Sequence, residues 1–403
     1  MYLTHLSLTD YRAFTRLDMD VPRRILLLVG DNAQGKTSIL EAVYYLATFT
    51  SCHAASDRQL VNFMASSESL AVGRLVADYR RGQSSHRIEV RLIQESGNGG
   101  ARLRKEILLD GVRKTAQTAM GHFTAVIFLP QMTRIVEGAP EERRRYLNLA
   151  LSQALPGYAR DLSEYSQLLA QRNALLKQLS ERSGDADQLV YWDELLAQRG
   201  AAIMYARIQA VCELEYAAIR IHHRLTSAQE VLRLQYLPAY DPLPQPNGQY
   251  TLPLAAQIDL KGISQEQLHR GFRQRLESLR REEIARGMTT VGPHRDDLRV
   301  IANSVDLGYY GSRGQVRTAL LALKLAEVSW LQAKTGHWPV LLLDEIMAEL
   351  DLQRRGDVLS ALADCEQALL TTTDLRLFSS DFVKDNTVWQ VTGGQVNAIP
   401  ADF

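Results

Sequence analysis

The residues with the clearest chemical use form a glycine-rich segment that ends in a lysine and a threonine. The segment consists of Gly30, Asp31, Asn32, Ala33, Gln34, Gly35, Lys36 and Thr37, followed by Ser38. It fits G-x-x-x-x-G-K-[ST], in which backbone N–H groups surround phosphates, the lysine reaches the β- and γ-phosphates and the threonine hydroxyl binds Mg²⁺. A chance glycine-rich turn is the structural alternative. The segment predicts an ATP and Mg²⁺ site in which Lys36 is also catalytic and Thr37 is a metal ligand.

Two adjacent carboxylates follow an apolar run near the other end of the chain. Val340 to Leu343 are apolar, and Asp344 and Glu345 come directly after them. A buried strand that ends in acids suits a nucleotide site, where Asp344 would help to hold Mg²⁺ and Glu345 would polarise the attacking water. A strand that merely ends in surface acids is the alternative. The pairing with the glycine-rich segment favours the catalytic interpretation.

A third segment could form a second anion receptor. Ser312, Gly314 and Gln315 stand at the start of a run of good helix formers and resemble the S-x-G-Q signature of ABC ATPases. A serine hydroxyl, a glycine amide and a helix N-terminus would together bind a phosphate, which in ABC dimers belongs to the nucleotide of the other subunit. A plain helix N-cap is the alternative. Because the segment lies one helix before the acidic strand, we assign these three residues to nucleotide binding.

Three smaller features fit the same chemistry. Gln131 follows the apolar residues 126–129 and could sense both the metal and the attacking water, as a ligand and as a catalytic residue. Residues 348–351 lie where ABC ATPases carry a loop that contacts the partner subunit. The segment 371–373 is a run of threonines where transporter ATPases usually have a histidine. This last difference favours a branch of the class that is not a transporter.

The periodicity of apolar residues predicts the elements that would position these groups. An apolar run at 25–29 indicates a central strand, and helical spacing follows at 37–48. Near the other end, the pattern predicts a helix at 315–334, a strand at 339–344 and a strand at 368–372. Alternation predicts an antiparallel start before residue 22 and further strands between 69 and 109, interrupted by a loop at 96–101.

The middle of the chain has a different character. Residues 141–234 favour long helices with a break at 183–185, residues 238–253 are rich in Pro and Tyr and predict a loop, and residues 264–286 predict another helix. We therefore expect an α/β protein with one ABC-type P-loop ATPase head assembled from both chain ends, residues 1–135 and 287–403. A mostly helical second lobe, residues 136–286, would be inserted between them and would contact DNA or a second subunit.

The amino-acid composition limits which partners the protein can bind and in which cellular compartment we expect it. The 403 residues include 46 Lys and Arg against 46 Asp and Glu, so DNA would have to be bound by a local basic patch. Candidate patches are 80–81, 102–105, 143–145 and the helix 270–286, although the acids mixed into that helix favour a self-paired face. The three cysteines show no metal-type spacing. The apolar runs are too short to span a bilayer, and the first residues show no secretion signal, so we expect a cytoplasmic protein without a membrane partner.

The chain resembles the RecF family, the recombinational-repair branch of the SMC/Rad50-like ABC ATPases. The resemblance includes residues 8–12, the glycine-rich segment, residues 140–147, residues 292–298 (Gly-Pro-His-Arg-Asp-Asp-Leu) and residues 341–351. It implies that Arg12 contacts the nucleotide. It also implies an ATP-dependent homodimer that binds DNA at single-strand/double-strand junctions, hydrolyses ATP weakly in a DNA-dependent way, and works with RecR and, indirectly, RecA. Val316 and the Pro-rich stretch depart from the family pattern, and neither removes a group with an assigned role.

Three other functions compete with a DNA clamp. The chain could be the ATPase subunit of a membrane transporter, although its threonine run argues against this. It could serve another SMC-like machine, or it could be a P-loop kinase for a small metabolite. A monomeric kinase would need Lys36 but would have no use for Ser312, so the two positions discriminate between these functions.

Overall fold

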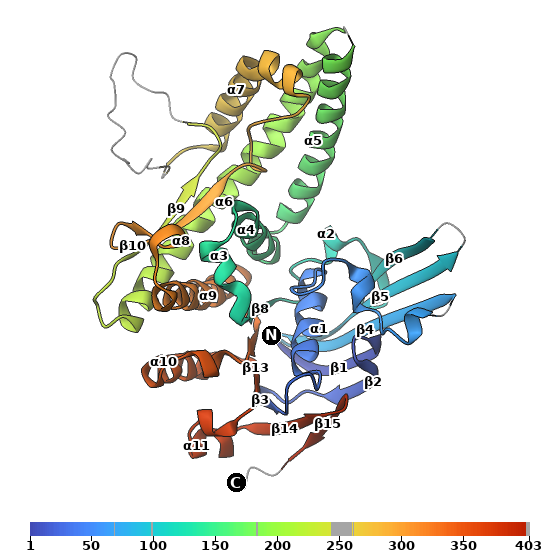
Figure 1. Ribbon diagram of the computed structural model, residues 1–403, viewed down its shortest axis with the longest axis vertical. Helices are drawn as coiled ribbons and strands as arrows, with labels where there is room; N and C mark the ends of the chain where they lie inside the picture. Colours follow the sequence, from blue (N-terminus) through green and yellow to red (C-terminus); the bar gives the residue numbers. More distant parts are fainter. Residues whose placement is uncertain (68, 98–99, 183, 243–259, 261, 400–403) are drawn as a thin grey trace. The chain divides into compact units, whose positions relative to one another are not determined.

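The structure is a computed structural model that describes the chain except residues 68, 98–99, 183, 243–259, 261 and 400–403 (Figure 1). The chain packs into two compact units: unit 1 comprises residues 1–132 and 327–403, and unit 2 comprises residues 133–326. Residues 287–326 thus pack within unit 2, whereas the sequence analysis grouped them with the ATPase head. Compactness and functional domains are different properties, so the boundaries 135/136 and 286/287 stay predictions.

Unit 1 contains an antiparallel sheet built from the first part of the chain. Its order is β2-β1-β4-β5-β6-β7, with bounds Phe14–Asp20, Tyr2–Tyr11, Leu70–Arg81, Ser84–Gly97, Gly100–Leu109 and Val112–Lys114. The antiparallel start and the later strands are confirmed. The loop predicted at 96–101 is wrong in its extent, because Ser96 pairs with Ala101 and Gly97 with Gly100 across the hairpin. Backbone pairing thus continues through residues whose composition favours a loop.

The second sheet of unit 1 carries the segments that matter for chemistry. Its order is β15-β14-β3-β13-β12-β8, and β3, β13, β12 and β8 run parallel, with bounds Gln395–Ala398, Thr387–Thr392, Arg24–Val29, Gln367–Thr372, Val340–Asp344 and Ala125–Phe128. Strands β12 and β13 are buried throughout and β3 is buried in its middle, as their apolar runs predict. Helix α1 (Lys36–Thr48) contacts strands of both sheets, and its buried residues join one core with them. Unit 1 also includes α2 (Ala116–Ala119), α10 (Leu352–Ala363) and α11 (Ser380–Lys384).

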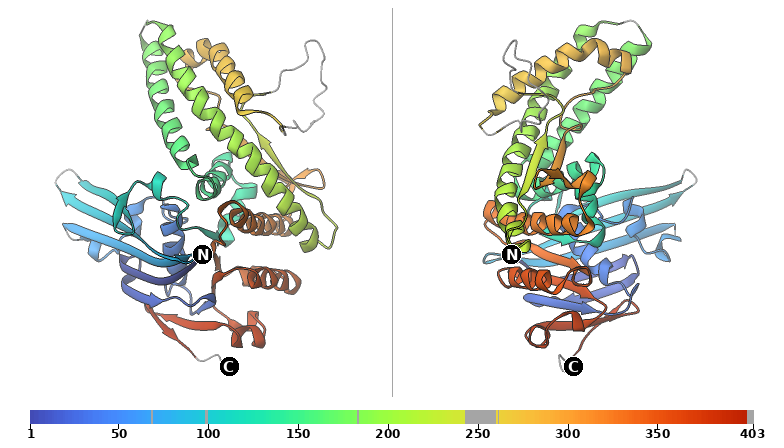
Figure 2. Two further views of the ribbon diagram at one scale, coloured as in Figure 1. Left: turned by 180° about the vertical axis from the view of Figure 1, so that it is seen from behind. Right: turned by 60° about the vertical axis from the view of Figure 1, so that its left-hand side comes forward.

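Unit 2 is mostly helical, and its long helices lie side by side (Figure 2). The long helices are α5 (Tyr158–Glu181), α6 (Leu189–Leu225) and α7 (Gln265–Arg286), and the shorter α3 (Arg134–Glu137) and α4 (Pro140–Ala154) precede them in the chain. A small sheet of β9 (Leu232–Leu237), β10 (Asp297–Ala302) and β11 (Val305–Asp306) precedes α8 (Leu307–Tyr310) and α9 (Arg313–Thr335), whose last residues belong to unit 1. Across the described ranges, no helix is both long and apolar enough to cross a membrane.

One prediction for unit 2 is wrong. Helix was expected as far as residue 234, but the chain forms strand β9 from Leu232. Leu232, Leu234 and Tyr236 alternate into the core, and β9 pairs with β10 more than sixty positions later, so a long-range contact decides this segment. The predicted Pro-rich loop lies largely outside the described residues.

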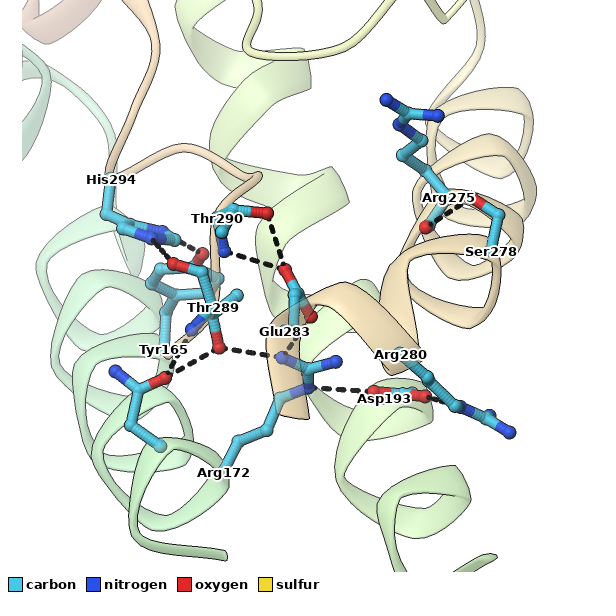
Figure 3. Close-up of polar contacts among 11 residues, drawn as sticks. Tyr165, Arg172, Asp193, Arg275, Ser278, Arg280, Glu283, Thr289, Thr290 and His294 are labelled. Carbon is cyan, nitrogen blue, oxygen red and sulfur yellow. Dashed lines mark hydrogen bonds and ion pairs between the residues drawn. The ribbon is translucent and has the colours of Figure 1, made fainter. Parts of the chain in front are cut away.

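A buried ionic cluster ties three helices of unit 2 together (Figure 3). The guanidinium of Arg172 on α5 donates to Asp193 on α6 over 2.8 Å and to Thr289 over 2.7 Å, and lies 2.7 Å from Glu283 on α7. All three charged side chains are at most 1% exposed. Arg280 donates to the second oxygen of Asp193 over 2.8 Å. The cluster fixes where α7 ends and where the segment after it begins.

Candidate functional site

The glycine-rich segment, residues 30–37, forms the turn between β3 and α1. Gly35 has φ 105°, and a Cβ there would lie 2.8 Å from the ring of Phe14. A Cβ on Gly30 would lie 2.3 Å from the carbonyl oxygen of Val391. Gly35 is therefore required by its backbone geometry and by close packing, and Gly30 by close packing. The backbone N–H of Gly393 donates to Gln34 over 2.6 Å and braces the turn from the β14–β15 hairpin.

The start of α1 is suited to an anion. Its N-cap is Gly35, which has no side chain to cap the first-turn amides, and the helix dipole adds positive potential there. Lys36 is 4% exposed, and its ammonium donates to the carbonyl oxygens of Gly30 over 2.6 Å and Asp31 over 2.9 Å. The cation is thus held inside the turn by acceptors that phosphate oxygens could replace.

Parallel strand pairing brings the acidic strand to the same place. β12 and β3 lie on either side of β13, so the carboxyl ends of all three strands meet. The Thr37 hydroxyl lies 2.9 Å from each carboxylate oxygen of Asp344. Thr371, which pairs with Asp344 across β13 and β12, donates its hydroxyl to the same carboxylate over 2.7 Å. The predicted partners, some three hundred positions apart in sequence, are therefore in contact.

Glu345 occupies an unusual backbone conformation directly after the strand. Its φ is 50°, in the left-handed region, and its backbone N–H donates to the Thr371 hydroxyl over 3.0 Å. Its carboxylate lies 3.1 Å from the ammonium of Lys36. Strain of this kind is concentrated at functional sites, where the surrounding structure maintains it. The turn directs the second acid toward the lysine of the glycine-rich segment.

Burial raises the pKa of Asp344, and the hydrogen bonds from Thr371 and Thr37 oppose that shift only partly. A carboxylate that loses water on burial gains most from a bound cation. Carboxylate and hydroxyl oxygens are ligands that Mg²⁺ accepts, usually together with water and phosphate oxygens. The side chains present thus fit the metal that the sequence predicts.

Gln131 lies in the same unit, after β8. Its amide nitrogen is 3.0 Å from the Nδ1 of His53, an exposed residue in the segment after α1. The positive charge of His53, when it is protonated, also acts to lower the pKa of Asp344. His53 thus joins the edge of the site, although no motif in the sequence pointed to it. The role of Gln131 as a metal and water sensor stays a prediction.

Arg12 is engaged within unit 1. Its guanidinium donates two hydrogen bonds of 2.9 Å to the carboxylate of Glu41 on α1, and Ser51 donates to the same carboxylate. Burial favours the neutral form of Glu41, but its pKa is lowered because hydrogen bonds from Arg12 and Ser51 outweigh that effect. Arg12 therefore anchors α1, and the nucleotide contact implied by the family resemblance stays a prediction.

The signature residues form the start of α9 in unit 2. The Ser312 backbone N–H donates to the Gln315 side chain over 3.0 Å, and the Gln315 N–H donates to the Ser312 hydroxyl oxygen over 3.2 Å. This capping box leaves the Ser312 hydroxyl proton available to an acceptor. A Cβ on Gly314 would meet only that hydroxyl oxygen, at 4.0 Å, so the glycine leaves open space. Glu230 accepts a 2.8 Å hydrogen bond from Gln315 and fixes its orientation, a role that only the fold reveals.

The basic run at 143–145 has a structural role in part. Arg143 is 8% exposed and donates to both oxygens of Asp297, over 2.7 and 3.0 Å. Arg144 donates to the backbone carbonyl of Asp296 over 2.9 Å. The prediction that this run forms a DNA patch is therefore wrong for Arg143, because a buried, bidentate guanidinium cannot reach a phosphate.

The segment 292–298 is held by buried polar groups. Asp296 accepts from Tyr236 and from the backbone N–H of Ala239, and Arg207 lies 3.5 Å from its carboxylate. His294 is hydrogen-bonded to the Tyr165 hydroxyl over 2.7 Å, and burial lowers its pKa to about 4 (Figure 3). This segment, which contributes to the family resemblance, therefore acts as an internal anchor of unit 2.

Comparisons with known proteins agree with this geometry over nearly the whole chain. Residues 2–392 match the family described as RecF/RecN/SMC N terminal domain. The DNA replication and repair protein RecF of Chloroflexus aggregans is 39% identical over 409 residues, covering 99% of this chain and 100% of that protein. Among solved structures, the recombination mediator protein RecF with ATP in the RecFOR pathway superposes with a TM-score of 0.81 at 27% identity, covering 99% of each chain. A RecF structure described with ATPrS gives 0.82 at 28% identity, covering 99% of this chain and 98% of that one.

Proposed function

Because the chain belongs to the RecF family of DNA replication and repair proteins, within the RecF/RecN/SMC ATPases, we propose that it is an ATP-switched DNA clamp. In this proposal ATP and Mg²⁺ join two copies of the chain, and the closed pair binds DNA at single-strand/double-strand junctions. Hydrolysis then opens the pair. A related structure described as the recombination mediator protein RecF with ATP in the RecFOR pathway supports a role in recombination. We extend this role to work beside RecR and, indirectly, with RecA, as the family resemblance implies.

The observation that carries the proposal is the contact between Thr37 and Asp344 at 2.9 Å, beside the Lys36–Glu345 pair at 3.1 Å. Thr37 and Asp344 would hold Mg²⁺, which neutralises charge on the β- and γ-phosphates when bound. Lys36 would exchange Glu345 for phosphate oxygens. Glu345, released from that ion pair, would then orient the water that attacks the γ-phosphate.

The second half of the site comes from another copy. Ser312 is exposed, and its hydroxyl proton is free to bind a phosphate oxygen at the N-terminus of a 23-residue helix. A γ-phosphate bound in this way by a second copy would hold two protomers together only while it remains attached. Loss of the γ-phosphate would open the pair, so the rate of hydrolysis would set how long the pair stays closed. Neither a monomeric metabolite kinase nor any other monomeric enzyme would need this second receptor.

DNA contact is best supported on one face of α7. Arg270 and Arg275 line a surface groove of about 760 Å³ together with Tyr240, Gln274 and Ser278. These two arginines and Arg281 are exposed and make no ion pair within the described part of the chain. By contrast, Arg280 is bound to Asp193 in the buried cluster. Unpaired arginines can release counterions from DNA phosphates, which is the main source of affinity that does not depend on sequence.

The switch is tested with Glu345→Gln, which should bind ATP-Mg²⁺ but hydrolyse it at a strongly reduced rate. We expect its molecular mass in light scattering to double with ATP and to stay that of a monomer with ADP. Adding Ser312→Arg should abolish that doubling while the monomer still binds ATP. A monomer at saturating ATP-Mg²⁺ would contradict the proposal.

The DNA face needs a separate experiment. The double variant Arg270→Glu/Arg275→Glu should weaken junction DNA binding at least tenfold and reduce the dependence on salt. The control is Arg160→Glu, which reverses one charge at an exposed position of α5, outside the groove. If the double variant binds DNA as tightly as the unchanged protein, this face of α7 is not the DNA-binding surface.

A further inference from the structure

Two adjacent tyrosines stand in solvent directly before the signature. Tyr309 is 75% exposed and Tyr310 is 80% exposed, and their ring centroids are 6.3 Å apart at an interplanar angle of 48°. Both belong to the short helix α8, and Ser312 follows two residues after Tyr310. Large aromatic side chains are enriched where protein surfaces meet and are costly to leave in water. We therefore expect another molecule to cover this pair of rings.

The backbone beneath the two rings is fixed. The Asp306 side chain caps α8 by accepting from the Gly308 N–H over 2.9 Å, and Leu307 is 1% exposed. A Cβ on Gly308 would lie 2.9 Å from the Val136 carbonyl oxygen, and one on Gly311 would lie 2.6 Å from that of Leu307. Close packing on both sides of the pair leaves the rings on a rigid base. A partner would therefore bind the rings without the loss of conformational entropy that ordering a loop requires.

The neighbouring groups indicate what the partner carries. Within four consecutive residues after Tyr309, the chain presents Tyr310, the Ser312 hydroxyl and the exposed guanidinium of Arg313. A hydroxyl donor and a cation at a helix start complement a phosphate, and aromatic rings beside them complement the protein surface around it. A second copy of this chain with a nucleotide in residues 30–37 would offer both features.

We infer that Tyr309 and Tyr310 form an aromatic contact with a second copy of this chain, beside the nucleotide that the second copy holds. This inference rests on the proposed ATP-dependent pair and adds the surface that would stabilise it. The rings become buried when the pair closes and return to solvent when it opens. Dimer stability would then depend on apolar burial as well as on the shared phosphate.

The test uses Glu345→Gln as the parent and measures its dimer dissociation constant with ATP-Mg²⁺ by sedimentation. Changing both tyrosines to alanine should raise that constant at least tenfold, whereas changing both to phenylalanine should raise it less than threefold. Tyr216→Ala, on α6 of the same unit and 70% exposed, is the matched control and should have no effect. Thermal melting of each variant shows that the fold is retained.

The outcomes separate the two ideas. If the alanine pair dimerises as well as the parent, the aromatic contact is wrong and the ATP-dependent pair stands. If the parent itself stays monomeric, both are wrong. If the alanine pair dimerises normally but loses DNA binding, the tyrosines contact nucleic acid, and the inference is likewise overturned.

Discussion

Two polar clusters in this molecule use the same residue types in opposite ways. At the candidate nucleotide site, Lys36, Glu345, Asp344 and two threonines bind one another at the carboxyl ends of parallel strands. In unit 2, Arg172, Asp193, Glu283 and Thr289 bind one another at almost zero exposure between three helices. The first cluster has acceptors that a ligand can replace. The second has none that a ligand can reach.

The difference shows how burial decides the use of a charge. A buried ion pair has already lost its water, so removing one partner leaves an uncompensated charge in the interior. In the first cluster Lys36 and Asp344 are nearly buried too, but Glu345 is 35% exposed, so a phosphate or a cation can reach the cluster and take the place of a protein partner. The clusters should therefore respond differently to mutation: the first should lose ligand binding, and the second should lose stability.

The largest effect is expected for Arg172→Ala. Because Asp193 and Glu283 would remain buried and charged, the free energy of unfolding should fall by about 3–5 kcal/mol. Arg199→Ala removes a guanidinium that pairs with Glu164 at an exposed position, so it should cost less than about 1 kcal/mol. Urea unfolding followed by circular dichroism measures both. Equal small losses would show that the cluster contributes little.

The next effect concerns Lys36→Ala. Losing charge-assisted hydrogen bonds to phosphates should weaken ATP binding about 100-fold, since each such bond contributes roughly 1.5–3 kcal/mol. Stability should change little, because the ammonium is held mainly by backbone carbonyls at the edge of the site. Lys384→Ala, in the exposed part of α11, is the control. Calorimetric titration with ATP-Mg²⁺ measures the affinity of each variant. An unchanged affinity of Lys36→Ala would show that Lys36 does not bind phosphate.

A third effect depends on pH. Burial lowers the pKa of His294 to about 4, so the folded protein binds this proton less readily than the unfolded chain, whose histidine has a pKa near 6.5. The stabilisation is complete above pH 6.5 and is lost as pH falls toward 4, by roughly 3 kcal/mol. His294→Gln should flatten that part of a plot of stability against pH. His5→Gln should not, because the pKa of His5 is raised, its hydrogen bonds to Asp20 and Asp18 outweighing burial.

The smallest effect is expected for Thr371→Val, which keeps the shape of the strand and removes one hydroxyl. Asp344 would lose a 2.7 Å hydrogen bond and the Glu345 N–H would lose its acceptor. ATP hydrolysis should slow about tenfold, with ATP affinity changed less than threefold, as expected if the two lost hydrogen bonds together contribute about 1.5 kcal/mol. Thr372→Val is the control, since the Thr372 hydroxyl contacts Asp374 instead. If the two variants hydrolyse ATP at the same rate, Thr371 does not support hydrolysis.

Local chemistry made much of the first cluster predictable. The segment 30–37, the apolar run before Asp344 and the helix after Gly311 each carry their own pattern, because phosphate turns, buried strands and capped helices depend on nearby residues. The candidate phosphate-binding segment and the adjacent carboxylates could therefore be predicted before their contact was seen. The second cluster had no such pattern, since Arg172 lies among many polar residues of a long helix.

By itself the sequence determined the apolar core strands, the helices that follow the phosphate turn and the signature, and the types of group available for chemistry. Only the tertiary structure decided that Thr371 supports Asp344, that His53 meets Gln131, that Glu230 holds Gln315 and that Arg143 is buried. Short-range periodicity and turn chemistry are recorded in neighbouring residues. Contacts between distant residues depend on strand order and on helix packing, which no local pattern specifies.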